Sequence, residues 1–536
     1  MRKEYLYKIY DSSGNYLTTW NDVISQPTFE WNINSGLGEM TIRLARLFDS
    51  FGEENDVNLN NEVRIFCKDI DAINGTIIYS GYISGYTPVL DDKNQYVDIT
   101  LLGYTSTLED DLLRNGNNTT VTYNSYDPID IVDDILNKYD GKIQPHLLSQ
   151  TKFPNNDVSS TVDSGDSPAG IINLYLIING SPSGNNLIPS SSSTILLQKN
   201  IWHSFGGKNY LPGISLTPSQ VNADNFGVEI QASDGGTSKF FITTNYKFNI
   251  PLTARIVGIK VWYKGKVTAN DFVLEEVNMD CFQLTVYYYD GEFVLSNTTI
   301  SYTFNTSTYL QAIKKIRELC PEGYYFYVDA NNLLHFKKKS TTAEHILQIG
   351  KHLIKVVSEK RLENVKNVVY FIGNGIYKTY TRSGSISSYG RRVHIIQDQR
   401  VTQEATANIM ATTFLDENEA VEIRTKLRII DNNAGTVNIG YDIESIRPGD
   451  TVQIKGFGTA YTQQLWDATL WDNGQWDNTI SYASGTIMQI VSVSYTPDYI
   501  DLEVSSKPIP VNNRIEDIYR NLEDYISKDN PSAPTT

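Results

Sequence analysis

The sequence predicts a mainly β chain with a minor share of α-helix, divided among several domains. One observation is the composition, because 35 Tyr among 536 residues is typical of pleated, half-buried surfaces. Another is that many segments alternate apolar and polar residues with the period of two that a half-buried strand requires. The length and the 40% hydrophobic content are sufficient for about three or four domains, each with its own buried core.

Residues 1–115 are predicted to form the first all-β domain. The segment EMTIRL at 39–44 places its apolar residues on one side, and YVDITLLG at 96–103 repeats this alternation. One half-buried antiparallel sheet or barrel is therefore expected here.

Residues 116–145 and 296–350 are predicted to form a small α+β domain. In DPIDIVDDILNKY, Asp127 can cap a helix whose apolar residues fall on one face. In NTSTYLQAIKKIRELCPEG, a helix is predicted to begin at a Thr306 or Ser307 cap. A hairpin, YYFYVDANNLLHFKKK, follows it.

Residues 146–295 differ in composition from the flanking segments and are predicted to form an inserted, jelly-roll-like β-sandwich. The segment opens with runs rich in Ser, Gly, Pro and Asn, which are typical of loops. It closes with two strong strands, ARIVGIKVWYKG at 254–265 and CFQLTVYYYD at 281–290.

Residues 351–508 are predicted to form a second all-β domain, with one helix near 403–416. The segment AVEIRTKLRIID at 420–431 alternates throughout. Its polar positions Arg424, Lys426 and Arg428 form a basic stripe. Because the formal net charge is −17, we expect salt bridges between subunits rather than phosphate contacts from this stripe.

A tryptophan hairpin is predicted as an insertion at 458–484 in this second domain. In LWDATLWDNGQWDN, the Asn-Gly pair suits a type I′ turn and would place Trp471 across from Trp476, with Trp466 beyond them. Exposed aromatic side chains mark binding sites or subunit contacts. These three indoles are the candidate contacts for a neighbouring protein or a glycan.

The last segment, 509–536, is predicted to be a short coiled-coil-like helix followed by a tail. Its apolar residues are spaced 4, 3, 4 and 3 apart, and Ile at successive a and d positions favours trimers. The predicted trimer seam consists of Val511, Ile515, Ile518, Leu522 and Tyr525.

Catalytic, metal and cofactor sites have no support in the sequence, so the chain is not expected to be an enzyme. The six His are scattered, the three Cys lie far apart, and HExxH, GxxxxGK[ST] and GxSxG are absent. The triplet Gly165-Asp166-Ser167 lacks a suitably spaced histidine and is interpreted as loop. The acidic balance argues against stable binding of nucleic acid, and neither a signal peptide nor membrane insertion is expected.

The order of these parts resembles the baseplate hub, or tail-tip, proteins of tailed bacteriophages. The resemblance covers about 1–145 and 295–525, with IRPGDTVQI the most specific phrase. It implies a homotrimer in which two tube-like β-barrel domains per chain, here 1–115 and 351–508, form a ring with pseudo-six-fold symmetry. Such a ring closes the tail tube, provides a channel for DNA ejection and anchors fibres or a spike.

The implied partners are other tail proteins: the distal tail or tube protein, the tape measure protein, and the fibres or spike. DNA would meet the chain only in transit. The implied location is the tail tip of the virion, assembled in the host cytoplasm. Two alternatives stay open: a receptor-binding tail protein that grips host-surface glycans for host attachment, and a tip enzyme that cleaves peptidoglycan.

Overall fold

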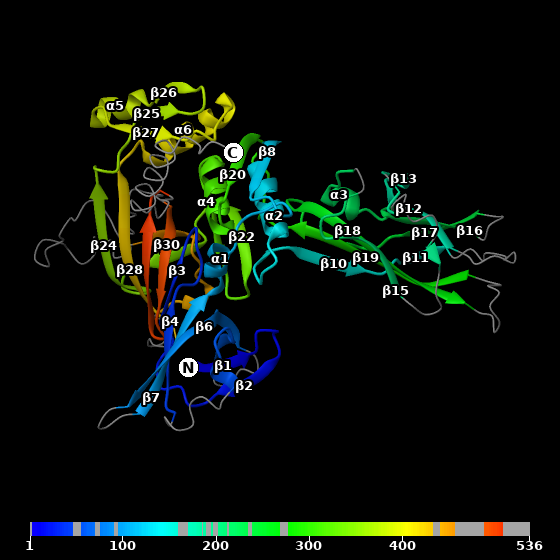
Figure 1. Cartoon of the computed structure of the whole chain (residues 1–536), viewed down its shortest axis with the longest axis horizontal. Coiled ribbons are helices and arrows are strands. Elements are labelled where there is room, and N and C mark those ends of the chain that lie inside the picture. Colours follow the sequence, from blue (N-terminus) through cyan, green and yellow to red (C-terminus); the bar gives the residue numbers. More distant parts are fainter. Residues whose placement is uncertain are drawn as a thin grey trace, which may run out of the picture. The chain divides into compact units, whose positions relative to one another are not determined.

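The computed structural model divides the chain into two compact units, Met1–Pro145 with Leu295–Thr536, and His146–Val294 (Figure 1). Both units are built mostly from strands, which confirms the predicted mainly β class. The structure describes residues 3–46, 55–69, 75–90, 95–158, 170–184, 186–188, 195–196, 202–211, 214–233, 238–267, 277–432, 440–455 and 487–507.

The first sheet of the larger unit has six strands in the order β2-β1-β5-β6-β7-β4. The buried positions of EMTIRL and YVDITLLG alternate as predicted, with Met40, Ile42 and Leu44 inward on one strand. The strands are β1 (Lys3–Tyr10), β2 (Tyr16–Trp20), β4 (Met40–Leu44), β5 (Glu62–Asp69), β6 (Thr76–Leu90) and β7 (Gln95–Gly103).

The second sheet of this unit has seven strands in the order β23-β29-β30-β31-β28-β24, with β3 also paired to β30. The end strands β23 and β24 follow one another in the chain, and Ile349 bridges Leu353 between them, so the sheet curves back on itself. The strands are β3 (Phe29–Asn32), β23 (His345–Gln348), β24 (Leu353–Arg361), β28 (Glu422–Ile430), β29 (Thr451–Lys455), β30 (Met488–Tyr495) and β31 (Tyr499–Ser505).

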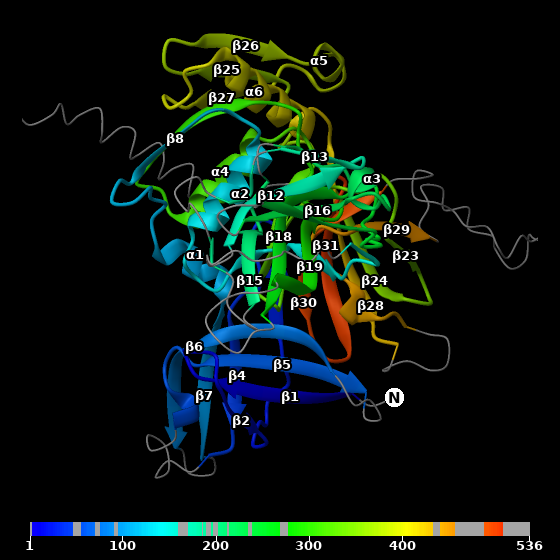
Figure 2. The same cartoon turned by 90° about the vertical axis from the view of Figure 1, so that its right-hand side faces the viewer.

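One continuous hydrophobic core joins the two sheets. It includes Ile99 and Leu101 from the first sheet and Leu427 and Leu502 from the second. Strand β3 comes from the N-terminal segment but pairs antiparallel with β30, which begins more than 400 residues later. Figure 2 shows the first sheet, in blue, beneath the orange and red strands of the second. The two sheets therefore form one packed body.

Four strands of each sheet repeat one topology. In chain order, β4, β5, β6 and β7 correspond to β28, β29, β30 and β31. The first set pairs antiparallel in the order β5-β6-β7-β4, and the second set pairs antiparallel in the equivalent order β29-β30-β31-β28. A β-bulge interrupts the third strand of each set at the same register position. It falls at Ser84, where the pairing passes from Leu101 to Thr100, and at Val491, where it passes from Val504 to Glu503.

A small α+β region of the same unit contains the predicted helices. Asp127 caps α2 by accepting a hydrogen bond from the backbone N–H of Ile129, as predicted. The cap of α4 is Thr308 rather than Thr306 or Ser307. The elements are α1 (Thr107–Asp110), β8 (Thr120–Tyr126), α2 (Pro128–Lys138), β9 (Gln144–Pro145), β20 (Ile300–Asn305), α4 (Tyr309–Leu319), β21 (Tyr324–Val328) and β22 (Leu333–Lys338).

A three-stranded sheet, β26-β25-β27, packs against helix α6. The ring of His394 on β27 stacks on Phe414 of α6, with 4.2 Å between the ring centroids. The helix predicted near 403–416 is α6. The elements are β25 (Val368–Ile372), β26 (Tyr377–Thr381), α5 (Ser383–Tyr389), β27 (Val393–Gln397) and α6 (Glu404–Asn418).

The smaller unit is a β-sandwich whose two sheets share one core. The first sheet has the order β10-β19-β18-β15, and the second the order β11-β17-β16-β12-β13 with β14 beside β12. The elements are β10 (Leu148–Lys152), β11 (Asn156–Val158), β12 (Gly170–Ile178), β13 (Ser181–Ser183), β14 (Ile195–Leu196), β15 (Trp202–Gly207), α3 (Pro218–Val221), β16 (Gly227–Ser233), β17 (Ser238–Thr244), β18 (Arg255–Val267) and β19 (Val277–Tyr289).

Candidate assembly site

A three-residue cluster marks the outer face of the first sheet. Arg43 on β4 lies directly opposite Asp98 on β7. Its Nε donates to Asp98 Oδ1 at 2.7 Å and its Nη2 donates to Oδ2 at 3.0 Å. The guanidinium carbon lies 3.8 Å from the centroid of the Tyr96 ring, two residues before Asp98. The arginine is thus held by a two-point ion pair and an aromatic face.

The second sheet carries the same cluster at the equivalent place. Arg428 on β28 lies opposite Asp501 on β31, with Nε to Oδ1 at 2.7 Å and Nη2 to Oδ2 at 2.6 Å. The guanidinium carbon lies 4.2 Å from the centroid of the Tyr499 ring, again two residues before the aspartate. Each chain therefore presents one polar arrangement twice.

Both clusters are accessible to another molecule. The Arg43 and Asp98 side chains are 43% and 24% exposed, and those of Arg428 and Asp501 are 36% and 43% exposed. The hydrogen bonds to the aspartates raise the pKa of both arginines, so both remain charged. Exposed ion pairs contribute little to stability. Stability alone therefore does not account for their repetition.

The basic stripe of the second sheet forms its salt bridges within the chain. Arg424 pairs with Glu422 and lies 3.3 Å from Glu503, while Arg428 pairs with Asp501. Both arginines of this stripe thus have acidic partners within the chain, and salt bridges between subunits stay a prediction. The cause is register, because the acidic residues of β31 lie directly across from β28 on the same face.

A buried polar cluster joins the start of the chain to the second sheet. Lys3 Nζ lies 2.9 Å from Asp431 Oδ1 and 2.5 Å from Glu444 Oε1, and its side chain is 8% exposed. Tyr495 donates to Glu444 at 2.8 Å. Burial alone would lower the pKa of Lys3, but hydrogen bonds to the two carboxylates raise it overall. Burial, with the charge of Glu444 and the neighbouring Tyr5, raises the pKa of Tyr495.

A small hollow lies beside this cluster, with a volume of about 50 Å³. Trp31, Asp329, Glu444, Arg447 and Tyr495 are among the residues that line it. Such a volume accommodates a few water molecules rather than an organic substrate. The hollow therefore does not define a catalytic pocket.

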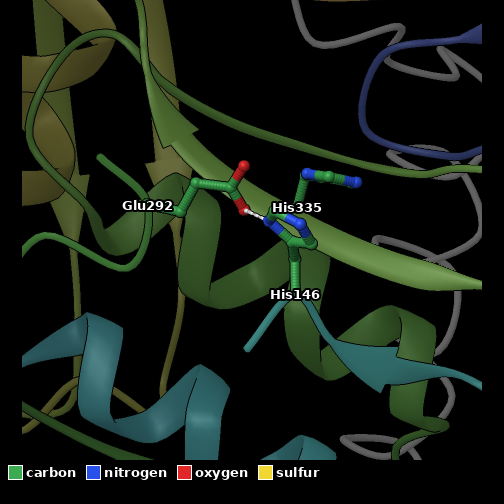
Figure 3. Close-up of side chains that lie close together, drawn as sticks. All are labelled: His146, Glu292 and His335. Carbon is green, nitrogen blue, oxygen red and sulfur yellow. Dashed lines mark ion pairs between the residues drawn. The ribbon is translucent and has the colours of Figure 1, made fainter. Parts of the chain in front are cut away.

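Histidines in the two units have acidic neighbours. In the sandwich unit, Nδ1 of His146 lies 3.1 Å from Glu292 Oε2 (Figure 3). In the larger unit, the ring of His335 stacks on Tyr327 at 4.6 Å, and its Nε2 lies 3.4 Å from Asp329 Oδ2. Each contact orients an imidazole within its own unit.

The contact residues chosen from the sequence lie outside the described residues. This holds for the candidate partner or glycan contacts and for the C-terminal helix with its trimer seam: Trp466, Trp471, Trp476, Val511, Ile515, Ile518, Leu522 and Tyr525.

The repeated cluster was missed, although the sequence carries a signal for it. YVDITL at 96–101 and YIDLEV at 499–504 share the Tyr-x-Asp pattern and the alternation around it. Comparing segments about 400 residues apart would have found this pair.

Comparisons with known proteins place the chain near solved tail proteins without showing a family. No family model and no curated protein matches the sequence. A prophage tail protein, gp18 of Listeria monocytogenes EGD-e, is 11% identical over 97% of this chain and 99% of its own, with a TM-score of 0.38.

Two further solved structures give similar values. The 43 kDa tail protein of prophage MuSo2 from Shewanella oneidensis is 9% identical over 94% of this chain and 98% of its own, with a TM-score of 0.42. A tail protein from Neisseria meningitidis MC58 is 8% identical over 94% of this chain and 96% of its own, with a TM-score of 0.40. All three scores lie below 0.5, so the superpositions carry no functional argument. Within the described residues, helices long and apolar enough to cross a membrane are absent.

Proposed function

We propose that this chain is a structural protein of a bacteriophage tail, a baseplate hub or tail-tip protein. The observation that carries the proposal is the repetition, within one chain, of a four-stranded sheet with the same bulge and the same Arg–Asp–Tyr cluster. The order of parts in the sequence, which resembles that of hub proteins, supports the same assignment.

The repetition suits a protein that joins two symmetries. A cyclic trimer of chains, each with two equivalent sheets, presents six similar surfaces. A partner with six-fold symmetry, such as a tail tube, can then contact each of them in nearly the same way. Arg43 and Arg428 would supply the same charge-assisted hydrogen bonds at alternate positions.

The junction between the sheets suits the same role. Strand β3, the shared core and the buried Lys3 cluster hold the two sheets as one body. Their relative orientation is therefore set when the chain folds, before any partner binds. In a ring of three such chains, a single kind of contact between neighbouring chains is therefore enough to arrange all six sheets.

The remaining roles follow from a ring of this kind. It would close the tail tube, provide a channel for DNA ejection and anchor fibres or a spike, without enzymatic activity. The net charge of −17 favours passage of DNA over trapping, because like charges repel. The C-terminal seam would add a three-stranded contact, and assembly would take place in the host cytoplasm before incorporation at the tail tip.

Single-particle imaging of the purified full chain tests the proposal. The expected image is a ring of three chains with six similar β-domains. A ring of six chains, or a chain that remains monomeric at micromolar concentration and does not join tail particles, contradicts it.

A further inference from the structure

The outer face of the sheet β10-β19-β18-β15 in the sandwich unit has an unusual set of side chains. Along β18, Ile259, Val261 and Tyr263 point into the core, so Lys260 and Trp262 point outward. Two tryptophans belong to this face, because Trp202 of β15 is 40% exposed and shares its side with Ser204, the partner of Trp262.

Trp262 belongs to a chain of hydrogen bonds that crosses three strands. Its Nε1 donates to Thr285 Oγ1 of β19 at 3.2 Å, and this hydroxyl lies 2.9 Å from Thr151 Oγ1 of β10. Thr285 is buried, and its hydroxyl is satisfied by Trp262 and Thr151. Lys260 Nζ lies 3.8 Å from the centroid of the Trp262 ring. The indole ring therefore has a cation over it.

Short hydrogen-bonding groups surround this platform. In register, Gln283 and Ser204 flank Trp262 on its two neighbouring strands. Gly206 lies beside Lys260, with φ of +82°, and a Cβ there would lie 2.1 Å from Ile259 O. Glycine is required there by this backbone contact, and it leaves no side chain beside Lys260. Small or polar residues thus border Trp262 and Lys260 on the neighbouring strands.

The charge on this face is opposite in sign to that of the chain. Among the described outward side chains of these four strands, the charged residues are Arg255 and Lys260, and acidic residues are absent. The whole chain carries a formal charge of −17. A local face of this sign suits a ligand with a negative group.

We propose that this face binds an acidic saccharide, a glycan that carries carboxylate groups. The C–H face of one sugar ring would stack on Trp262, displacing the ammonium group of Lys260 toward the carboxylate of the ligand. Gln283, Ser204 and Thr151 would exchange hydrogen bonds with ring hydroxyls. The ligand class is set by this combination of an aromatic platform, short polar side chains and a cation.

Two other occupants fit the face less well. A second protein chain favours an apolar, fully buried patch at the centre of the contact, whereas Thr, Ser and Gln surround this tryptophan. Nucleic acid requires several basic groups along a track, and this face offers two. The inference does not depend on the proposed tail role, since a ring can assemble whether or not the sandwich binds sugar.

Binding of the full-length protein to an array of neutral and acidic oligosaccharides tests the proposal. Oligogalacturonate and galactose oligomers of equal length form a matched pair in the array. We expect binding to acidic members, with weaker binding to neutral counterparts. Titration calorimetry then gives the dissociation constant for the best acidic ligand.

Three variants separate the contributions. Trp262→Ala should weaken binding on the order of tenfold or more, and Trp262→Phe should restore part of the affinity because a ring returns. Lys260→Gln should weaken binding of the acidic ligand while leaving the neutral one nearly unchanged. The control Lys247→Gln, at an exposed lysine of the same unit, should bind as the unmodified protein.

Three results would overturn the proposal. The first is that the protein binds no saccharide on the array. The second is that Trp262→Ala, while folded, binds the acidic saccharide with unchanged affinity. The third is that the protein binds no saccharide and Trp262→Ala instead loses binding to another protein. Circular dichroism melting of Trp262→Phe verifies that the sandwich remains folded. The ring image described above is unaffected by any of these results, so the two proposals fail separately.

Discussion

Asp98 and Asp501 occupy the same position in two sheets of one chain. Each accepts two hydrogen bonds from the arginine directly opposite, and each follows by two residues the tyrosine on which that arginine stacks. The equivalence extends to the β-bulge beside them. The two sheets therefore carry the same Arg–Asp–Tyr cluster at equivalent positions of the same strand arrangement.

Changing both arginines to alanine should impair assembly without unfolding the protein. Arg43→Ala with Arg428→Ala should leave the melting temperature within about 2 °C, because exposed ion pairs contribute little to stability. Incorporation into tail particles should fall more than with either single change. Particle reconstitution measures this, with Arg114→Ala, at an exposed arginine of the same unit, as the control. Equal incorporation by the double variant and the control contradicts the assembly role.

Lys3→Met should destabilise the larger unit by about 3–5 kcal/mol, because it leaves buried Asp431 and half-buried Glu444 without this cation. Lys3→Arg should recover part of that loss. Urea denaturation measures the free energy of unfolding. Lys8→Met, on the same strand, is the control, and an equal effect there would show that the strand rather than the charge is responsible.

The stability should fall in acid through Asp56. Burial opposes the charged form, but hydrogen bonds from Arg46 and Trp20 hold the pKa of Asp56 below its ordinary value of 3.8. The group therefore adds stability above about pH 4, which is lost as pH falls through the depressed pKa. Asp56→Asn should flatten this part of the unfolding free energy measured from pH 7 to pH 2. If Asp56→Asn leaves the pH dependence of the unfolding free energy unchanged in shape, Asp56 is not responsible for the loss of stability in acid.

Phe29→Ala should destabilise both sheets together. The ring stacks on Tyr495 at 4.9 Å and lies 5.2 Å from Tyr79, so its loss opens a cavity in the shared core and costs about 3–5 kcal/mol. Hydrogen exchange should accelerate in β7 and in β31 alike. Tyr16→Ala, at an exposed ring, is the control. Faster exchange in one sheet alone would mean that the sheets unfold independently.

Deleting 146–294 and joining Pro145 to Leu295 through a short glycine-rich linker should leave a folded larger unit. The two units are separately compact, as expected of parts that can fold alone. Size-exclusion chromatography and thermal melting of the shortened chain measure the outcome. Insoluble protein would show that the sandwich is needed for folding.

Local features of this fold could be predicted from the sequence because their causes are local. Alternation in EMTIRL identified the inward face of β4, and Asp127 identified the start of α2. The cap of α4 was misplaced because Thr306 adopts a left-handed backbone with φ of +50°, whereas a cap residue has extended backbone, as Thr308 has with φ of −70° and ψ of 162°.

Features that depend on register between distant strands could not be predicted in this way. The basic stripe around Arg428 was visible, but its partner Asp501 depends on how β28 pairs with β31, some 70 residues later. The same holds for β3, since nothing within FEWN at 29–32 indicates that it pairs with β30. The tryptophan hairpin and the C-terminal seam stay predictions.

The pairing of β3 with β30 also fixes when folding can finish. Phe29 pairs with Tyr495, and 495 − 29 gives a separation of 466 residues. At about 5–20 residues per second of synthesis, the first residue waits roughly 20–90 seconds on the ribosome before its partner exists. The second sheet is therefore completed by one of the oldest parts of the chain, so its core cannot close until residue 495 has been synthesised.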